Sequence, residues 1–260
     1  MSLASIDSYV GGRSPLHLWT PRLKLLGLGC LMFAFAAIRH LPLVVPMLGT
    51  TALIYALSGL PLAFLLKRLR YPGLFILTVV LILPLTSGET VLWQWGLFAL
   101  RQEGIMAMTL VVSRFVCILT LGFVLLGTTP FVTLLRSLRA LGLPTLLTDM
   151  TLLTYRYLFE TADMLSTMQR SMRLRGFGHT KRRWLSLQKQ DLQRLVGLLA
   201  TLLIRSYERA ERIYTAMRLR GYGRLKHPPA RANVDAASAC LTGAAVAIAI
   251  IFVAIEVAIQ

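Results

Sequence analysis

The chain has 260 residues, of which 56% are hydrophobic and only 15% charged, and its mean hydropathy is +0.66. Its 28 lysines and arginines outnumber its 11 aspartates and glutamates, so the formal net charge is +17. A soluble domain carries about 25% charged residues. The composition therefore excludes a disordered chain, argues against a soluble enzyme, and favours a membrane protein with one strongly basic side.

A membrane-spanning helix needs about 20 mostly apolar residues, and five segments approach that length. These segments are Leu23–Ile38, Leu41–Leu57, Tyr71–Ser87, Gly104–Gly127 and Ala236–Ile255. The sequence therefore predicts an all-α polytopic membrane protein with about five transmembrane helices. We expect Lys24, at the start of the first segment, to extend its amine towards the membrane surface.

Basic loops mark the cytoplasmic side of a membrane protein. Lysines and arginines precede the first span, occupy residues 67–70, and fill the long segment between the fourth and fifth spans. We therefore expect a cytoplasmic N-terminal segment over 1–22, four transmembrane helices over 23–127, a cytoplasmic domain over 128–235 and a last transmembrane helix over 236–260. Loop 88–103 and the C-terminus would then lie outside the cell membrane.

Arg114 is the one charge well inside a predicted span. Charges at such positions deserve a functional hypothesis, because an unpaired ion is costly in the bilayer. We favour a structural pairing with Glu103 or with a backbone carbonyl over contact with a substrate. Alternatively, the uncharged residues 115–135 form the span, and Arg114 lies at its outer end.

Residues 131–231 hold 19 lysines and arginines and 6 acidic residues. Apolar residues recur there at helical spacing, which predicts two long amphipathic helices. The first set is Met150, Leu153, Tyr157, Met164, Met168 and Met172, and the second is Leu192, Leu195, Leu199, Leu202, Tyr207, Ala210, Tyr214 and Met217. The ten uncharged residues Leu195–Ile204 are too few to span, so this helix should lie at the interface or pack on spans. A simpler alternative is a polybasic stretch that only touches anionic lipid.

A heptapeptide occurs twice at the ends of these two predicted helices. Residues 172–178 read Met-Arg-Leu-Arg-Gly-Phe-Gly, and residues 217–223 read Met-Arg-Leu-Arg-Gly-Tyr-Gly. Gly176 and Gly221 fall where a left-handed C-cap would lie, so both copies could be ordinary helix ends. That reading does not explain why the copies are nearly identical. Because arginine binds carboxylates through a two-pronged fork, the repeat favours two equivalent docking sites for acidic grooves.

The sequence resembles the transmembrane (T) components of energy-coupling-factor transporters. The resemblance is strongest at the two arginine-glycine motifs and extends over most of the chain. It rests further on Ser14-Pro15-Leu16-His17, Pro21-Arg22-Leu23-Lys24, Arg114, Thr128-Thr129-Pro130, Leu141-Gly142-Leu143-Pro144, Tyr155-Arg156-Tyr157 and Glu160. Ile6-Asp7 and Ser14-Pro15 look more like the CbiQ-like cobalt/nickel type than the shared vitamin type.

The resemblance implies a coupling scaffold that has no catalytic residues and no cofactor. Its partners would be two P-loop ATPase subunits, as a homo- or heterodimer, and a substrate-binding S component in the membrane. The ATPase-docking residues would be Arg173, Arg175, Gly176, Phe177, Arg218, Arg220, Gly221 and Tyr222. The S component would contact Met164, Met168, Leu199 and Leu203. The substrate would be cobalt or nickel ion, or alternatively a vitamin such as biotin.

Motifs of other chemistry are missing from the sequence. It has no G-x-x-x-x-G-K-[ST] loop, no H-E-x-x-H and no G-x-S-x-G, and its four histidines are scattered, which predicts no metal site. A membrane-anchored lipid-modifying enzyme would need a cluster of acids or a nucleophile. A membrane-tethered nucleic-acid binder would account for the charge but not for the repeat, so we expect no nucleic acid partner.

Overall fold

The computed structural model describes residues 14–86, 91–95, 98–175, 189–223 and 235–259. Apart from two short strands, every element in these residues is helical, which confirms the predicted all-α class. The chain divides into two compact units: unit 1 comprises residues 1–142 and 231–260, and unit 2 comprises residues 143–230. Helix α6 (Phe131–Ala140) therefore belongs to unit 1, although the sequence analysis grouped it with the basic segment that follows.

Within the described residues, three segments of unit 1 are long and apolar enough to cross a membrane. They are Leu41–Ser58, Gly104–Thr128 and Ala236–Ile259, and each coincides with a predicted span. The first comprises η2 (Leu41–Leu43) and α3 (Val44–Ser58), the second lies in α5 (Gln102–Thr128), and the third is α9 (Ala236–Ile259). The predicted span 23–38 forms α2 (Pro21–Ala37), whose 17 residues extend about 26 Å.

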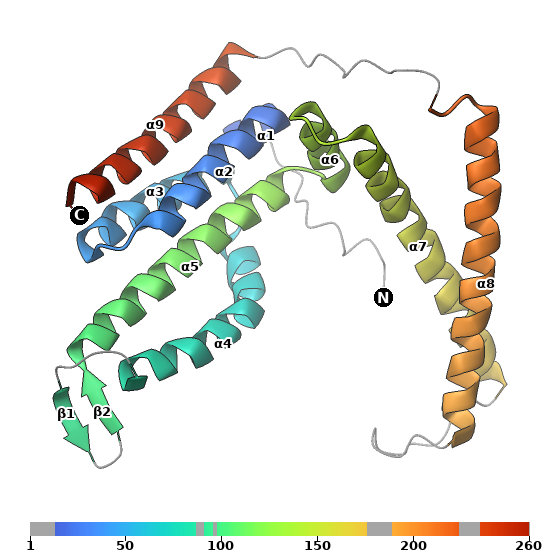
Figure 1. Cartoon of the computed structure of the whole chain (residues 1–260), viewed down its shortest axis with the longest axis horizontal. Coiled ribbons are helices and arrows are strands. Elements are labelled where there is room, and N and C mark those ends of the chain that lie inside the picture. The colour runs from blue at the N-terminus through green and yellow to red at the C-terminus, as the bar shows by residue number, and fades with distance from the viewer. Residues whose placement is uncertain (1–13, 87–90, 96–97, 176–188, 224–234, 260) are drawn as a thin grey trace. The chain divides into compact units, whose positions relative to one another are not determined.

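The prediction of a loop at 67–70 was wrong. These residues lie inside α4 (Leu62–Thr86), and the guanidinium of Arg68 lies 4.7 Å from the ring centroid of Phe64, one turn earlier. Lysine and arginine are good helix formers, so a basic cluster does not by itself end a helix. Figure 1 shows that α4 bends along its course, and Pro72, which cannot donate a backbone hydrogen bond, lies within it.

The segment predicted as loop 88–103 contains a short hairpin. Strands β1 (Val91–Trp95) and β2 (Phe98–Arg101) pair antiparallel, with Trp95 opposite Phe98 and Val91 opposite Arg101. The aromatic residues Trp93, Trp95 and Phe98 favour strands. The hairpin directly precedes α5 and lies near the C-terminal end of α4. It therefore stands where α4 ends and α5 begins (Figure 1).

Helix α2 lies at the centre of unit 1, between α9 and α5 (Figure 1). Leu31 and Phe35 on α2 are fully buried, and the ring of Phe35 meets Phe252 of α9 edge to face, with centroids 5.3 Å apart. Gly27 permits this close packing, because a Cβ there would lie 3.3 Å from the Cβ of Ala245 and 3.2 Å from Trp19. The first long helix and the last one therefore share one core.

Before α2, the short helix α1 (Pro15–Leu18) and residues 19–20 are fixed by side chains. The hydroxyl of Ser14 and Nδ1 of His17 share a hydrogen bond of 2.6 Å. Trp19 Nε1 donates to Thr242 Oγ1 at 3.0 Å, and the backbone N–H of Thr20 donates to Ser238 Oγ at 3.1 Å. Residues 19–20 are therefore bound to the first turns of α9.

Unit 2 consists of the two long helices that the sequence analysis predicts. Helix α7 spans Thr145–Leu174 and α8 spans Lys189–Leu219, and they pack against each other. Leu198 of α8 is 8% exposed, and Arg209 of α8 forms an ion pair with Glu160 of α7. Many apolar side chains of both helices remain exposed within the unit. Large exposed apolar surfaces are typical of regions that contact other molecules.

Candidate functional site

The first arginine motif lies at the C-terminal end of α7. Arg175 is the C-cap residue, and its backbone N–H donates to the carbonyls of Ser171 and Met172 at 3.2 and 3.1 Å. The side chains of Arg173 and Arg175 are exposed. Gly176 and Phe177, which complete this predicted docking motif, lie outside the described residues.

The second motif ends α8 in a Schellman cap. Gly221 has φ = 79°, its N–H donates to Arg218 O at 3.0 Å, and the N–H of Tyr222 donates to Met217 O at 3.0 Å. This confirms the predicted left-handed cap at Gly221. The cap explains the glycine, but it uses no arginine side chain. Arg220 and Arg218 are exposed, and the guanidinium of Arg218 lies 5.8 Å from the ring centroid of Tyr214.

Tyr222, which the resemblance places among the ATPase-docking residues, also makes a contact within unit 2. Its hydroxyl donates to Asp149 Oδ2 of α7 at 3.0 Å, and 45% of its surface remains exposed. The aromatic residue of the second motif therefore joins the end of α8 to the beginning of α7. The side chains of Arg218 and Arg220, by contrast, are exposed.

The predicted apolar face of α8 combined residues from two different faces. Leu195, Leu202 and Met217 are partly buried, as predicted. The other five of that set are exposed: Leu192 at 52%, Leu199 at 60%, Tyr207 at 72%, Tyr214 at 61%, and Ala210. Periodicity alone could not separate the two faces, because α8 is apolar over more than half of its circumference between Leu195 and Ile204.

The residues predicted to contact an S component fall into two groups. Met164 and Met168 of α7 are partly buried. Leu199 and Leu203 of α8 are exposed, at 60% and 70%. Only the second pair is open on the surface of unit 2, on a stripe of α8 that also includes Val196 and Tyr207.

A groove of about 570 Å³ lies between the C-terminal part of α7 and the N-terminal part of α8. The groove is lined by three arginines, Arg175, Arg194 and Arg205. The other lining residues, Met168 among them, are uncharged. Three arginines and no carboxylate in one groove make a strongly positive surface, which suits an acidic partner.

Sequence reasoning missed a buried lysine in unit 1. Lys24 is 1% exposed, so the prediction that its amine reaches the membrane surface was wrong. Its Nζ donates to the carbonyl of Leu16 at 3.0 Å, to Thr129 Oγ1 at 3.1 Å and to Thr128 Oγ1. Three motifs that the sequence analysis noted separately, at 14–17, 21–24 and 128–130, therefore meet at this amine. An ammonium group with three donors needs three acceptors when buried, and it has them here.

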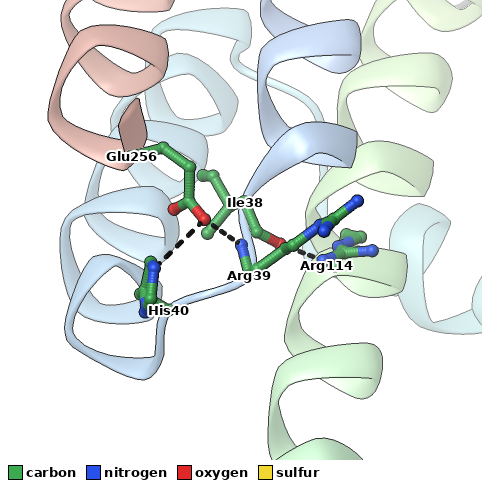
Figure 2. A network of polar contacts seen from close by, with 5 residues as sticks. All are labelled: Ile38, Arg39, His40, Arg114 and Glu256. Carbon is green, nitrogen blue, oxygen red and sulfur yellow. Dashed lines mark hydrogen bonds and ion pairs between the residues drawn. The ribbon is translucent and has the colours of Figure 1, made fainter. Parts of the chain in front are cut away.

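Arg114 contacts a backbone carbonyl, which was one of the two partners considered for it. Its Nη2 donates to the carbonyl of Ile38, at the end of α2 (Figure 2). Glu256 of α9, which the sequence analysis did not single out, accepts the N–H of Arg39 at 2.9 Å. Arg114 and Lys24 therefore each join α2 to α5, Lys24 near the beginning of α2 and Arg114 just beyond its end.

The described residues contain no cluster of three or more histidine, cysteine, aspartate or glutamate side chains that could hold a metal ion. The candidate functional features of the molecule are thus the exposed arginine ends of unit 2, its positive groove and its apolar α8 stripe. Together with the apolar helices of unit 1, they are the features of an all-α membrane protein with a second, basic unit.

The chain belongs to the CbiQ family. The model of this family, described as cobalt transport protein, matches residues 12–229. The match includes both arginine motifs and Lys24 and Arg114, but it ends before α9 and Glu256.

Curated relatives carry one common name, energy-coupling factor transporter transmembrane protein EcfT. The protein of Brevibacillus brevis is 30% identical over 233 residues, which cover 84% of each chain. That of Limosilactobacillus fermentum is 29% identical over 229 residues, covering 83% of this chain and 82% of its own. That of Bacillus subtilis is 29% identical over 240 residues, covering 85% and 87%. These similarities confirm the resemblance to T components of energy-coupling-factor transporters.

Proposed function

We propose that this chain is the coupling subunit of an ATP-driven importer in the cell membrane. In this proposal, two P-loop ATPase subunits dock on the ends of α7 and α8, and a separate membrane subunit binds the substrate. Closure of the ATPases moves α7 and α8, and this movement reorients the substrate-binding subunit. ATP hydrolysis takes place in the partners, since the chain has no P-loop sequence.

The observation that carries the proposal is the placement of the repeated heptapeptide. Both copies fall at the C-terminal ends of the two long helices of unit 2, with Arg175 and Arg220 exposed. Two equivalent motifs call for two equivalent grooves, as a pair of similar ATPase subunits would provide. The nucleic-acid and lipid-enzyme alternatives do not account for this symmetry.

The substrate is proposed as cobalt or nickel ion, held by the substrate-binding subunit. The description of the matching family as cobalt transport protein supports this choice. A vitamin importer with the same coupling role is the second candidate, because the curated relatives share a name that specifies no substrate. Uptake of radiolabelled cobalt and biotin by cells expressing the full transporter separates the two.

The docking test compares the double variants Arg175→Ala/Arg220→Ala and Arg173→Ala/Arg218→Ala for capture of the ATPase subunits from detergent extracts. Arg175→Ala/Arg220→Ala should lose capture of the ATPase subunits and abolish uptake, while the chain stays inserted in the membrane. Truncating a desolvated arginine–carboxylate contact costs about 2–5 kcal/mol, or roughly 30-fold or more in affinity. Arg→Lys should rescue poorly, because a point charge does not reproduce the fork.

The comparison variant is Arg173→Ala/Arg218→Ala, which removes the same number of charges from the same helix ends. Although Arg173 and Arg218 belong to the predicted docking motif, they lie two residues earlier, on another side of each helix, so their loss should matter less. Normal capture and normal uptake by the Arg175/Arg220 variant would refute the docking role. The purified chain alone should hydrolyse no ATP, and it should acquire ATPase activity only with its partners.

A further inference from the structure

One peptide group in unit 1 is held by opposite charges on its two sides. Arg114 of α5 donates to the carbonyl of Ile38, and the N–H of Arg39 donates to Glu256 Oε1 of α9 at 2.9 Å. That carbonyl and that N–H belong to the same peptide unit. Figure 2 shows the peptide lying between the two side chains, so the arginine and the glutamate are linked through it and not directly.

Both charged residues lie in helices that can cross a membrane. Glu256 is 8% exposed within α9, and Arg114 is half-buried within α5. Charged side chains at such sites are costly, and well-packed apolar residues would avoid that cost. Arg114 Nε and Glu256 Oε2 are also buried without a hydrogen-bond partner among the described residues. Ordinary packing therefore gives no reason for these two charges.

The peptide itself supplies a reason. Ile38 is the C-cap of α2 and is extended, with ψ = 128°, so the helix provides no donor for its carbonyl. Helix η2 begins at Leu41, so residues 38–40 form a very short turn in which a backbone N–H also needs an acceptor. The peptide dipole has its negative end at the oxygen and its positive end at the N–H. Arg114 faces the first and Glu256 the second, which is the favourable order.

We propose that Arg114 and Glu256 are a positioning pair whose charges compensate each other through the Ile38–Arg39 peptide. The pair fixes the turn that joins α2 to the candidate span Leu41–Ser58, between α5 and α9. Because the peptide is polar and directional, the pair works in one orientation only. His40 also lies on the Glu256 side of the peptide, with Nε2 3.8 Å from Glu256 Oε1, and it is partly exposed.

The test uses four variants of the full chain, expressed in membranes and extracted in detergent. The measurement is the fraction that remains folded and monodisperse after a heat step. Arg114→Gln and Glu256→Gln each leave one charge uncompensated, and each should lower that fraction on the order of tenfold. The double variant Arg114→Gln/Glu256→Gln removes both charges and keeps an amide at each position. It should recover most of the loss.

The fourth variant, Arg114→Glu/Glu256→Arg, exchanges the two charges. A direct ion pair would survive this exchange. The peptide-bridged pair should not, because a carboxylate would face the carbonyl of Ile38 and a guanidinium would face the N–H of Arg39. The exchanged variant should therefore be at least as unstable as the single variants.

Arg39→Gln is the matched control, because only the backbone of Arg39 contacts Glu256, and it should show no loss. Losses in the double Gln variant as large as the two single losses combined would overturn charge compensation. Rescue by the exchanged variant would overturn the peptide bridge in favour of a direct pair. Wild-type behaviour of both single variants would overturn the positioning role altogether.

Discussion

The hydroxyl of Tyr222 donates a hydrogen bond to Asp149 Oδ2, which joins the residue after the second arginine-glycine pair to the second turn of α7. One part of the repeated motif thus serves the packing of unit 2. Arg220, two residues earlier, remains exposed. Structural and docking roles can therefore be separated by substitution within a single heptapeptide.

Tyr222→Phe should lower the stability of the chain slightly without weakening ATPase capture. It removes one partly exposed hydrogen bond, so we expect a loss of about 1 kcal/mol or less in detergent unfolding. Tyr214→Phe is the control, because Tyr214 is exposed and its hydroxyl makes no hydrogen bond within the described residues. Equal unfolding curves for both variants would contradict the role of the Asp149 contact.

Gly221→Ala should destabilise the end of α8. Gly221 has φ = 79°, and a side chain there costs about 1 kcal/mol. Gly197→Ala, inside the same helix with open space around its Cβ, should have the opposite sign, with a gain of up to about 1 kcal/mol. Thermal unfolding followed by circular dichroism at 222 nm measures both. A gain or no change at Gly221 would disprove the left-handed cap.

Lys24→Met should destabilise unit 1 more than any exposed lysine does. The change removes the amine that donates hydrogen bonds to the Leu16 carbonyl and to two threonine hydroxyls. It also removes the cost of burying a charge, which offsets part of that loss. We expect a net loss of about 2 kcal/mol, measured as a lower temperature of aggregation in detergent. Lys67→Met, exposed on α4, is the control and should differ little from the wild type.

Single cysteines that replace Lys67 and Trp93 should be labelled by a membrane-impermeant thiol reagent from opposite sides of the membrane. The distribution of lysine and arginine predicts that position 67 reacts from the cytoplasm and position 93 from outside. Cys30 and Cys240 are exposed and must first be replaced, whereas Cys117 is buried and can stay. Labelling of position 93 from the cytoplasm would reverse the predicted topology.

Structural features that depend on composition and on helical periodicity could be predicted from the sequence. It predicted the all-α class, the three candidate spans and the two long helices, because apolar runs and 3.6-residue periodicity are local signals. It also placed the cap at Gly221, since glycine after a basic helix end is a local signal too. The basic cluster at 67–70 misled because charge indicates sidedness and not helix termination.

Contacts between segments far apart in the chain could not be predicted from the sequence. Lys24 and Glu256 meet partners far along the chain, at Thr128–Thr129 and at Arg39, and no spacing rule links such positions. A lysine beside an apolar run is more often at the surface, so burial of Lys24 contradicted the general expectation. Its neighbours were visible as separate motifs, but only the fold shows that they surround one amine.

The packing of α2 against α9 also sets the order in which the protein can be completed during synthesis. Helix α2 is synthesised long before α9, so the face of α2 around Gly27 and Phe35 has no packing partner until α9 has been made. Until then, the indole N–H of Trp19 and the N–H of Thr20 also lack their acceptors on α9. The core around α2 can therefore be completed only after α9 has been synthesised, because the hydrogen bonds that join the two segments link residues that lie 218 and 223 positions apart.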